Sequence, residues 1–171
     1  MTTKCSELPW SKRLIQVNLI ALIIAMVFST YMLLIKSWVF VMIYWIAWGL
    51  YFTVGRYVSC RHCEFHGKPC TSWCMGLIGG KLYKRSEKKH IFEDKGLLKM
   101  FFFDVSFFAI AALLPVVVYI YYLFNTGLNL IDWILFAIYG LIAIIVFLLH
   151  QIGCNKCPLK QCPMNRSQKK K

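Results

Sequence analysis

The chain has 171 residues, of which 59% are hydrophobic and 16% are aromatic. The apolar residues occur in long runs, which excludes an ordinary soluble domain and indicates a membrane protein. The formal net charge of +13 would suit a nucleic-acid-binding protein if the chain were soluble. Because no recognition motif accompanies this charge, we expect Lys and Arg to flank membrane helices and nucleic acid not to be a partner.

Four apolar segments are each long enough to cross a bilayer as a helix. The first, residues 14–35, would extend about 33 Å, and a hydrocarbon core is about 30 Å thick. It is too long for the apolar part of a cleaved signal peptide, so we expect no such peptide. Short turns join the segments in pairs, which predicts an all-α fold, an integral membrane four-helix bundle of two helical hairpins. The predicted parts are an N-terminus (1–13), a first transmembrane hairpin (14–58), a cysteine-rich basic loop (59–96), a second transmembrane hairpin (97–152) and a cysteine-rich basic tail (153–171).

The distribution of positive charge predicts the orientation. Of the 20 Lys and Arg residues, only Lys36 falls on the side of the two short turns. The others share the opposite side with both termini, the long loop and all 8 cysteines. The positive-inside rule places that side in the cytoplasm, so we expect a multi-pass protein of the cytoplasmic membrane with both termini inside.

Two Cys-x-x-Cys pairs form the strongest motif of the chain. Cys60 and Cys63 follow the second apolar segment, and Cys154 and Cys157 follow the fourth, at an offset of 94 residues. This weak internal repeat would bring both pairs to one place. Two such turns supply four thiolates to one tetrahedral site, and a reducing cytoplasm disfavours disulfides. These four cysteines are therefore the predicted metal ligands.

The identity of the metal stays open between a zinc ion and an iron–sulfur cluster. Pro158 and Pro163 each follow a cysteine, which is frequent near iron–sulfur clusters. The closely spaced three-cysteine run of ferredoxins is absent, however, and zinc sites also use paired Cys-x-x-Cys. Thiol chemistry without a metal is the third interpretation.

Further candidate ligands lie beside these pairs. They are three cysteines and two histidines of the same segments, namely Cys70, Cys74, Cys162, His62 and His66. They would complete the first site or form a second one. We expect His90, which lies in a basic run, to be solvated. Cys5 is expected to be incidental or acylated near the membrane.

Polar residues also lie inside the cytoplasmic ends of the apolar segments, and Asn18, Asp104 and His150 are the three we single out. Ionisable groups within a membrane are usually paired and often functional. We hypothesise that Asp104 and His150 form a pair that supports the metal ligands or handles protons, with Asn18 at the same depth. The alternative is a local pairing of Asp104 with Lys99 or Arg56.

Three features outside the cysteine clusters add expectations. Asp132 would lie in the first turn of the last helix, where a negative charge suits the helix dipole. Gly140, at the centre of that helix, predicts a close helix contact. Residues 75–90 would either form an amphipathic helix on anionic lipid headgroups or remain a solvated basic loop.

These features favour an integral membrane metal-binding protein whose cytoplasmic thiolate module is structural or docks a protein partner. The alternatives are a membrane electron-transfer component with an iron–sulfur centre and a thiol oxidoreductase. Four-helix thiol oxidoreductases need cysteines near the outer face, where this chain has none, and metal transport would need cysteines or acids along the spans. The sequence assigns no enzyme activity, because it contains no phosphate-binding loop, Gly-x-Ser-x-Gly or His-Glu-x-x-His motif.

Overall fold

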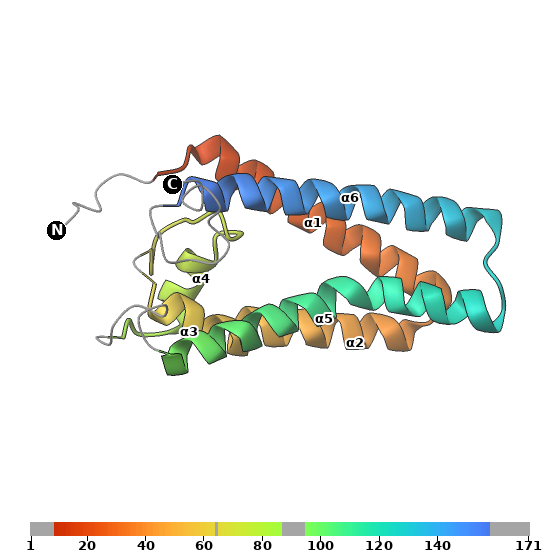
Figure 1. The fold of residues 1–171 in the computed structure, drawn as a ribbon, viewed down its shortest axis with the longest axis horizontal. Coiled ribbons are helices and arrows are strands. Elements are labelled where there is room, and N and C mark those ends of the chain that lie inside the picture. Colours follow the sequence, from red (N-terminus) through yellow and green to blue (C-terminus); the bar gives the residue numbers. More distant parts are fainter. Residues whose placement is uncertain (1–8, 64, 87–94, 158–171) are drawn as a thin grey trace.

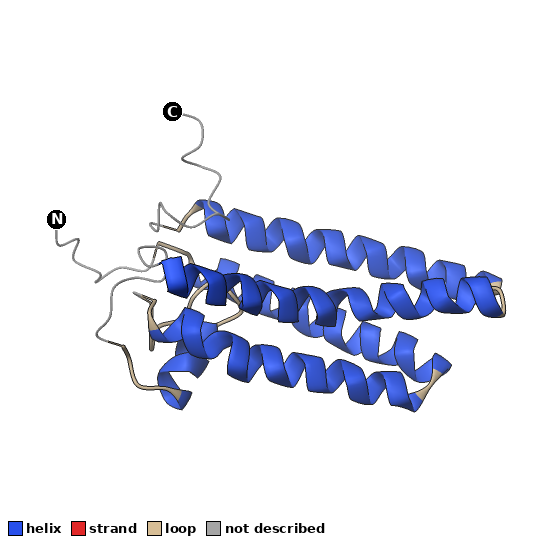
Figure 2. Cartoon of the chain, turned by 60° about the horizontal axis from the view of Figure 1, so that its bottom comes forward, coloured by secondary structure: helices blue, strands red, loops and turns tan. Residues whose placement is uncertain are grey.

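Helices make up almost the whole of the described chain. The computed structural model describes residues 9–63, 65–86 and 95–157, and this part contains no strand (Figure 2). The elements in chain order are α1 (Lys12–Lys36), α2 (Trp38–Leu50), a π-helical turn η1 (Tyr51–Gly55), α3 (Arg56–Arg61), α4 (Met75–Leu82), α5 (Lys95–Asn125) and α6 (Leu130–Asn155).

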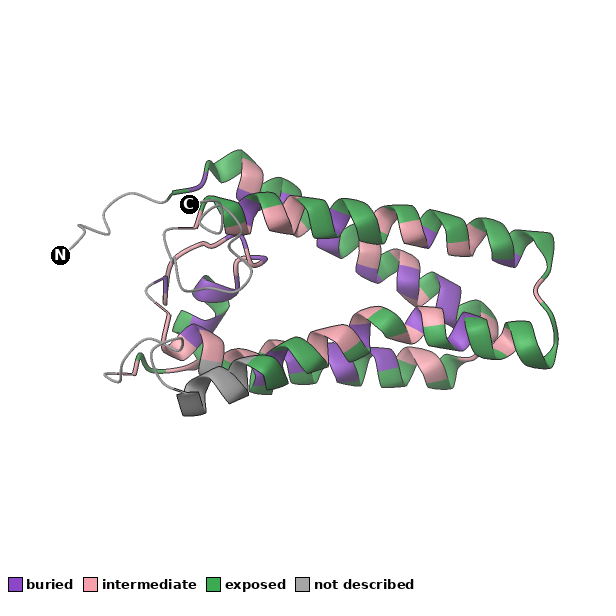
Figure 3. Cartoon of the chain, viewed as in Figure 1, coloured by how far each residue is buried: buried purple, intermediate pink, exposed green. Residues whose placement is uncertain are grey.

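Four helical stretches are long and apolar enough to cross a membrane. They are α1, the continuous run Trp38–Arg61 formed by α2, η1 and α3, most of α5, and α6. Large apolar side chains remain exposed along their outward faces, and the buried residues line the inward faces (Figure 3). In water such exposure would favour aggregation, whereas in a bilayer lipid covers it. The prediction of four apolar spans is confirmed, and the fold fits a multi-pass membrane protein.

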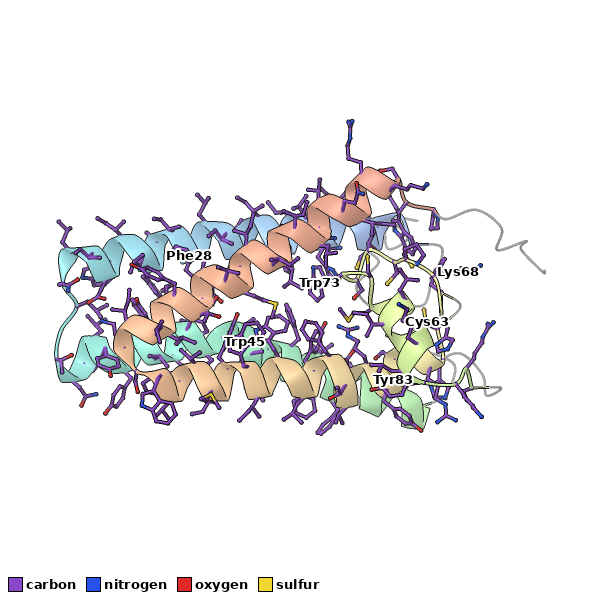
Figure 4. The ribbon with its side chains drawn as sticks, turned by 180° about the vertical axis from the view of Figure 1, so that it is seen from behind. Phe28, Trp45, Cys63, Lys68, Trp73 and Tyr83 are labelled. Atoms are coloured by element: carbon purple, nitrogen blue, oxygen red, sulfur yellow. The ribbon has the colours of Figure 1, made fainter. Side chains whose placement is uncertain are left out.

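The helices pack most closely across the two halves of the chain. The first helix α1 lies along α6, and α2 lies along α5, with a further contact between α1 and α2. Figures 1 and 4 show that the two pairs approach each other at the end of the short turns and separate toward the other end. We call this second end the divergent end. It contains the start of α1, the end of α6, the short helix α4 and residues 62–74, which we call the cysteine loop.

The end with the short turns is held by a buried ion pair. The Lys36 ammonium lies 2.7 Å from the Asp132 carboxylate, and both side chains are largely buried. Asp132 and Asn129 also form a reciprocal capping box at the start of α6. Asp132 thus lies in the first turn of α6, as predicted, and it also binds the turn between α1 and α2.

Two finer expectations differ from the structure. The predicted close helix contact at Gly140 is wrong for this chain, because a Cβ atom built there meets nothing within 4 Å. The stretch at 75–90 contains a helix, α4, but α4 ends at Leu82. Residues 87–90, including His90, lie outside the described part of the chain.

Candidate thiol site at the divergent end

Both Cys-x-x-Cys pairs have the same local structure. Cys60 lies in α3 and Cys154 in the last turn of α6, and each is followed by a turn that carries the second cysteine. The amide of Cys63 donates to the Cys60 carbonyl at 3.3 Å, and the amide of Cys157 donates to the Cys154 carbonyl at 3.1 Å. A helix end has unpaired carbonyls that such turns satisfy. Each pair is therefore placed by the end of a helix that would cross the membrane.

Cysteines from both motifs gather at the divergent end. Cys63, Cys70, Cys74 and Cys157 pack around the buried ring of Phe65, which also contacts the ring of Trp10 at 4.7 Å between centroids. Cys60 belongs to the neighbouring main core. Within the described residues, no group of three or more His, Cys, Asp or Glu side chains is arranged to hold a metal ion. Cys5 and Cys162 lie outside those residues.

Backbone amides point at two of the sulfur atoms. The amide of Phe65 donates to Cys63 Sγ at 3.5 Å, and that of Gly76 donates to Cys70 Sγ at 3.3 Å. Burial nevertheless raises the pKa of the Cys63 thiol to about 12, and the neighbouring thiols add to the rise. Burial also raises the pKa of Cys70 and of Cys74. At neutral pH these groups are therefore thiols unless a cation takes the place of the proton.

Hydrogen bonds from α1 hold the cysteine loop against α6. Asn18, fully buried, donates from its amide nitrogen to the Thr71 carbonyl at 3.0 Å and to the Leu149 carbonyl at 3.4 Å. The Trp10 indole donates to the Gly153 carbonyl at 2.9 Å. Asn18, predicted to support the metal ligands, thus binds the backbone that carries them.

Glycines of α4 allow the helix to touch the cysteine loop. A Cβ atom at Gly76 would lie 2.4 Å from the Lys68 carbonyl oxygen and 2.5 Å from that of Phe65. A Cβ atom at Gly79 would lie 2.6 Å from the Cβ atom of Cys60. Only glycine fits such close approaches. Sequence reasoning treated these glycines as weakening the helix and missed this contact.

Trp73 joins the cysteine loop to the interior of the bundle. Its ring stacks on Phe108 of α5 at 5.2 Å and on His150 of α6 at 4.8 Å between centroids. Figure 4 shows Trp73 directed between the helix pairs, while Cys63 lies nearer the end of the molecule. Trp73 and Cys74 both have left-handed backbone conformations, with φ of 53° and 59°. Such strain in bulky residues persists only where the surroundings enforce it.

Asp104 pairs with Arg56 rather than with His150. The Arg56 guanidinium lies 3.4 Å from the Asp104 carboxylate, and the Ser59 hydroxyl donates to that carboxylate at 2.9 Å. Arg56 also lies over the ring of Tyr51 at 4.3 Å. The alternative interpretation of Asp104 is thus the one that the structure shows.

The predicted histidines contact the cysteine pairs. His150 Nε2 lies 3.4 Å from Cys154 Sγ, and the second nitrogen of this ring has no hydrogen-bond partner in the described part of the chain. His66 Nδ1 lies 3.0 Å from the Cys60 carbonyl oxygen. His62, one turn from Cys60, is partly buried. These rings surround the cysteines as neighbours of the sulfur-bearing turns.

A cavity of about 430 Å³ runs from these groups into the bundle. Its wall includes both ends of the cysteine pairs, with five cysteines contributing: Cys60, Cys63, Cys70, Cys154 and Cys157. Trp73, Arg56 and His150 line the same space. Comparisons of the chain with family models, curated proteins and solved structures find no match. The chemistry of the site therefore rests on its own residues, which combine buried thiols, an ion pair and an apolar chamber.

Proposed function

We propose that the chain is a membrane protein of two helical hairpins whose cytoplasmic cysteine-rich module binds a soft metal ion or cluster. The observation that carries this proposal is the shared cavity, because its wall contains cysteines from both Cys-x-x-Cys pairs although the pairs lie 94 residues apart. The ligands would be Cys60, Cys63, Cys154 and Cys157. Cys70 is a fifth donor on the same wall.

Several properties of the thiols suit a cation. Thiolate sulfur prefers zinc, copper(I) or iron–sulfur centres over hard cations. A buried thiolate is unfavourable without a compensating charge, and a bound cation supplies that charge while it displaces the protons. Amide donors such as those to Cys63 and Cys70 are common around metal-bound sulfur and tune its properties.

The centre would act in one of two ways. A zinc ion would fasten the cysteine loop to the end of α6, stabilising a face for a protein partner, with the basic segments against anionic lipid headgroups. An iron–sulfur cluster would instead transfer electrons. The cavity that joins the thiols to the apolar interior favours this second candidate, because a membrane-soluble electron carrier could approach the cluster there.

The test is elemental analysis and an absorption spectrum of protein purified anaerobically. We expect about one zinc ion, or iron with labile sulfide and visible absorption, per chain. Cys63→Ser and Cys157→Ser should each lose most of the bound metal, and the double variant should lose little more, because both ligands serve one centre. Cys74→Ser is the matched control, since Cys74 is not part of the cavity wall.

Two results would overturn the proposal. One is a metal content near zero in protein that remains folded. The other is a set of unequal and additive losses in the two single variants, which would indicate separate sites.

A further inference from the structure

The cavity between the helix pairs has the form of a site for a membrane-soluble molecule. It reaches from Ser29 of α1 and Tyr44 of α2, near the middle of the bundle, to Cys63 and Cys157 at the divergent end. Its volume of about 430 Å³ lies within the usual range for sites that enclose a small organic ligand. This feature is independent of the metal proposed above.

Small side chains keep the deeper part of the cavity open. Ala25 of α1, Ala112 of α5 and Ala143 of α6 all line it, together with Leu22 and Val146. None of these side chains offers a hydrogen bond. The deep part of the cavity therefore suits a hydrocarbon chain.

The cavity also reaches the surface that lipid would cover. Val105 of α5 and Phe147 of α6 line it, yet 41% and 51% of their surfaces are exposed. The helices α5 and α6 are consecutive but are not among the closely packed pairs. A molecule dissolved in the bilayer could thus enter between these two helices without passing through water.

The end near the thiols suits a flat, uncharged head group. The stacked rings of Phe108, Trp73 and His150 form an aromatic wall there. The charge of Arg56 is already balanced by Asp104, so a second charged group would lack a partner. A zwitterionic or anionic lipid head would lose its hydration at this end of the cavity without gaining a counter-ion.

Several hydrogen-bond donors at this end lack an acceptor. Within the described part of the chain, the indole nitrogens of Trp48 and Trp73 and the Nε atom of Arg56 are buried without a partner. All three side chains line the cavity. A ligand with carbonyl oxygens would supply acceptors after small side-chain rotations, and buried donors favour such pairing strongly.

We propose that this cavity binds one isoprenoid quinone. The quinone ring lies against Trp73 and Phe108 with its carbonyl oxygens toward the unpaired donors, and the tail follows the alanine-lined part. The remainder of the tail leaves between Val105 and Phe147 into the bilayer. This class of molecule combines a flat neutral ring, two acceptors and a hydrocarbon tail.

The test is a titration of the full chain in detergent with a benzoquinone that carries a decyl tail, followed by tryptophan fluorescence and native mass spectrometry. We expect saturable binding of one molecule per chain. Ala143→Phe fills the cavity and should weaken binding at least tenfold. Ala137→Phe makes the same change on the exposed face of α6, outside the cavity wall, and should bind like the parent protein.

Two controls keep the result interpretable. The thermal unfolding of Ala143→Phe is compared with that of Ala137→Phe, and Ala25→Leu fills the cavity from α1 if the first variant fails to fold. Decylbenzene, which has the tail but no carbonyl group, should bind at least tenfold more weakly. Equal binding by the filled and control variants, or equal binding of decylbenzene, would overturn the proposal.

Discussion

Replacing Gly76 with alanine tests how the cysteine loop is held against α4. The new methyl group would lie 2.4 Å and 2.5 Å from the carbonyl oxygens of Lys68 and Phe65. Backbone oxygens cannot rotate away, so α4 and the loop must separate. Overpacking typically costs about 1–3 kcal/mol, and we take the upper value here. The better helix propensity of alanine offsets at most about 1 kcal/mol, which leaves about 2 kcal/mol of local destabilisation.

Alkylation of Cys63 and Cys70 in the metal-free protein measures this change. Burial raises the pKa of Cys63 to about 12 from an ordinary value of 9.0, so at pH 8 the reactive thiolate forms almost only when the loop opens. An opening equilibrium shifted by about 2 kcal/mol corresponds to labelling about 30-fold faster. Residue-resolved mass spectrometry at several time points gives the two rates.

Gly140→Ala is the matched control, because a Cβ atom at Gly140 meets nothing within 4 Å. It makes the same chemical change in α6 and should leave both labelling rates and the unfolding temperature unchanged or slightly improved. The reasoning would be refuted if Gly76→Ala labelled no faster than Gly140→Ala. Such a result would mean that α4 and the loop can separate at no cost.

The remaining predictions concern the ion pair and the orientation. Asp104→Asn leaves the Arg56 charge without its partner and should lower the unfolding free energy by about 3–5 kcal/mol in detergent. Ser59→Ala removes one hydrogen bond to the same carboxylate and should cost less, about 1.5–3 kcal/mol, and the reverse order would contradict this account of the pair. An impermeant thiol reagent added to intact cells should leave the protein unlabelled until the cells are opened, because all cysteines are expected on the cytoplasmic side. Rapid labelling of intact cells would show that the orientation is wrong.

The membrane spans were predictable because hydropathy and length determine them. Each predicted span agrees with its helix to within a few residues, as residues 14–35 do with α1 (Lys12–Lys36). The partners of the helices were not predictable in the same way. The helices are apolar on most of their surface, since lipid covers the outward faces, and so no polar stripe marks the face that packs against a neighbour.

The candidate site was predictable only at the level of residue type. Cys-x-x-Cys spacing identified the sulfur-bearing turns, and their burial in one cavity follows from where α3 and α6 end. The partner of Asp104 could not be selected, because Arg56 precedes it by 48 residues and only the packing of α3 on α5 brings the two together. Trp73 gave one signal, an aromatic residue inside a polar cysteine-rich stretch, which was not followed.

The polar residues inside the spans are explained by the backbone of the cysteine loop. The loop closes the space between the diverging helix pairs, and Thr71 within it is 4% exposed. Irregular backbone at the edge of a bilayer is stable only where its amides and carbonyls find partners inside the protein. Asn18 supplies such a partner to Thr71, and the amide of Gly67 donates to the Gly76 carbonyl at 2.8 Å. An asparagine in an apolar helix is therefore required by the loop whether or not a metal binds, since without it the Thr71 carbonyl would lose the donor shown here.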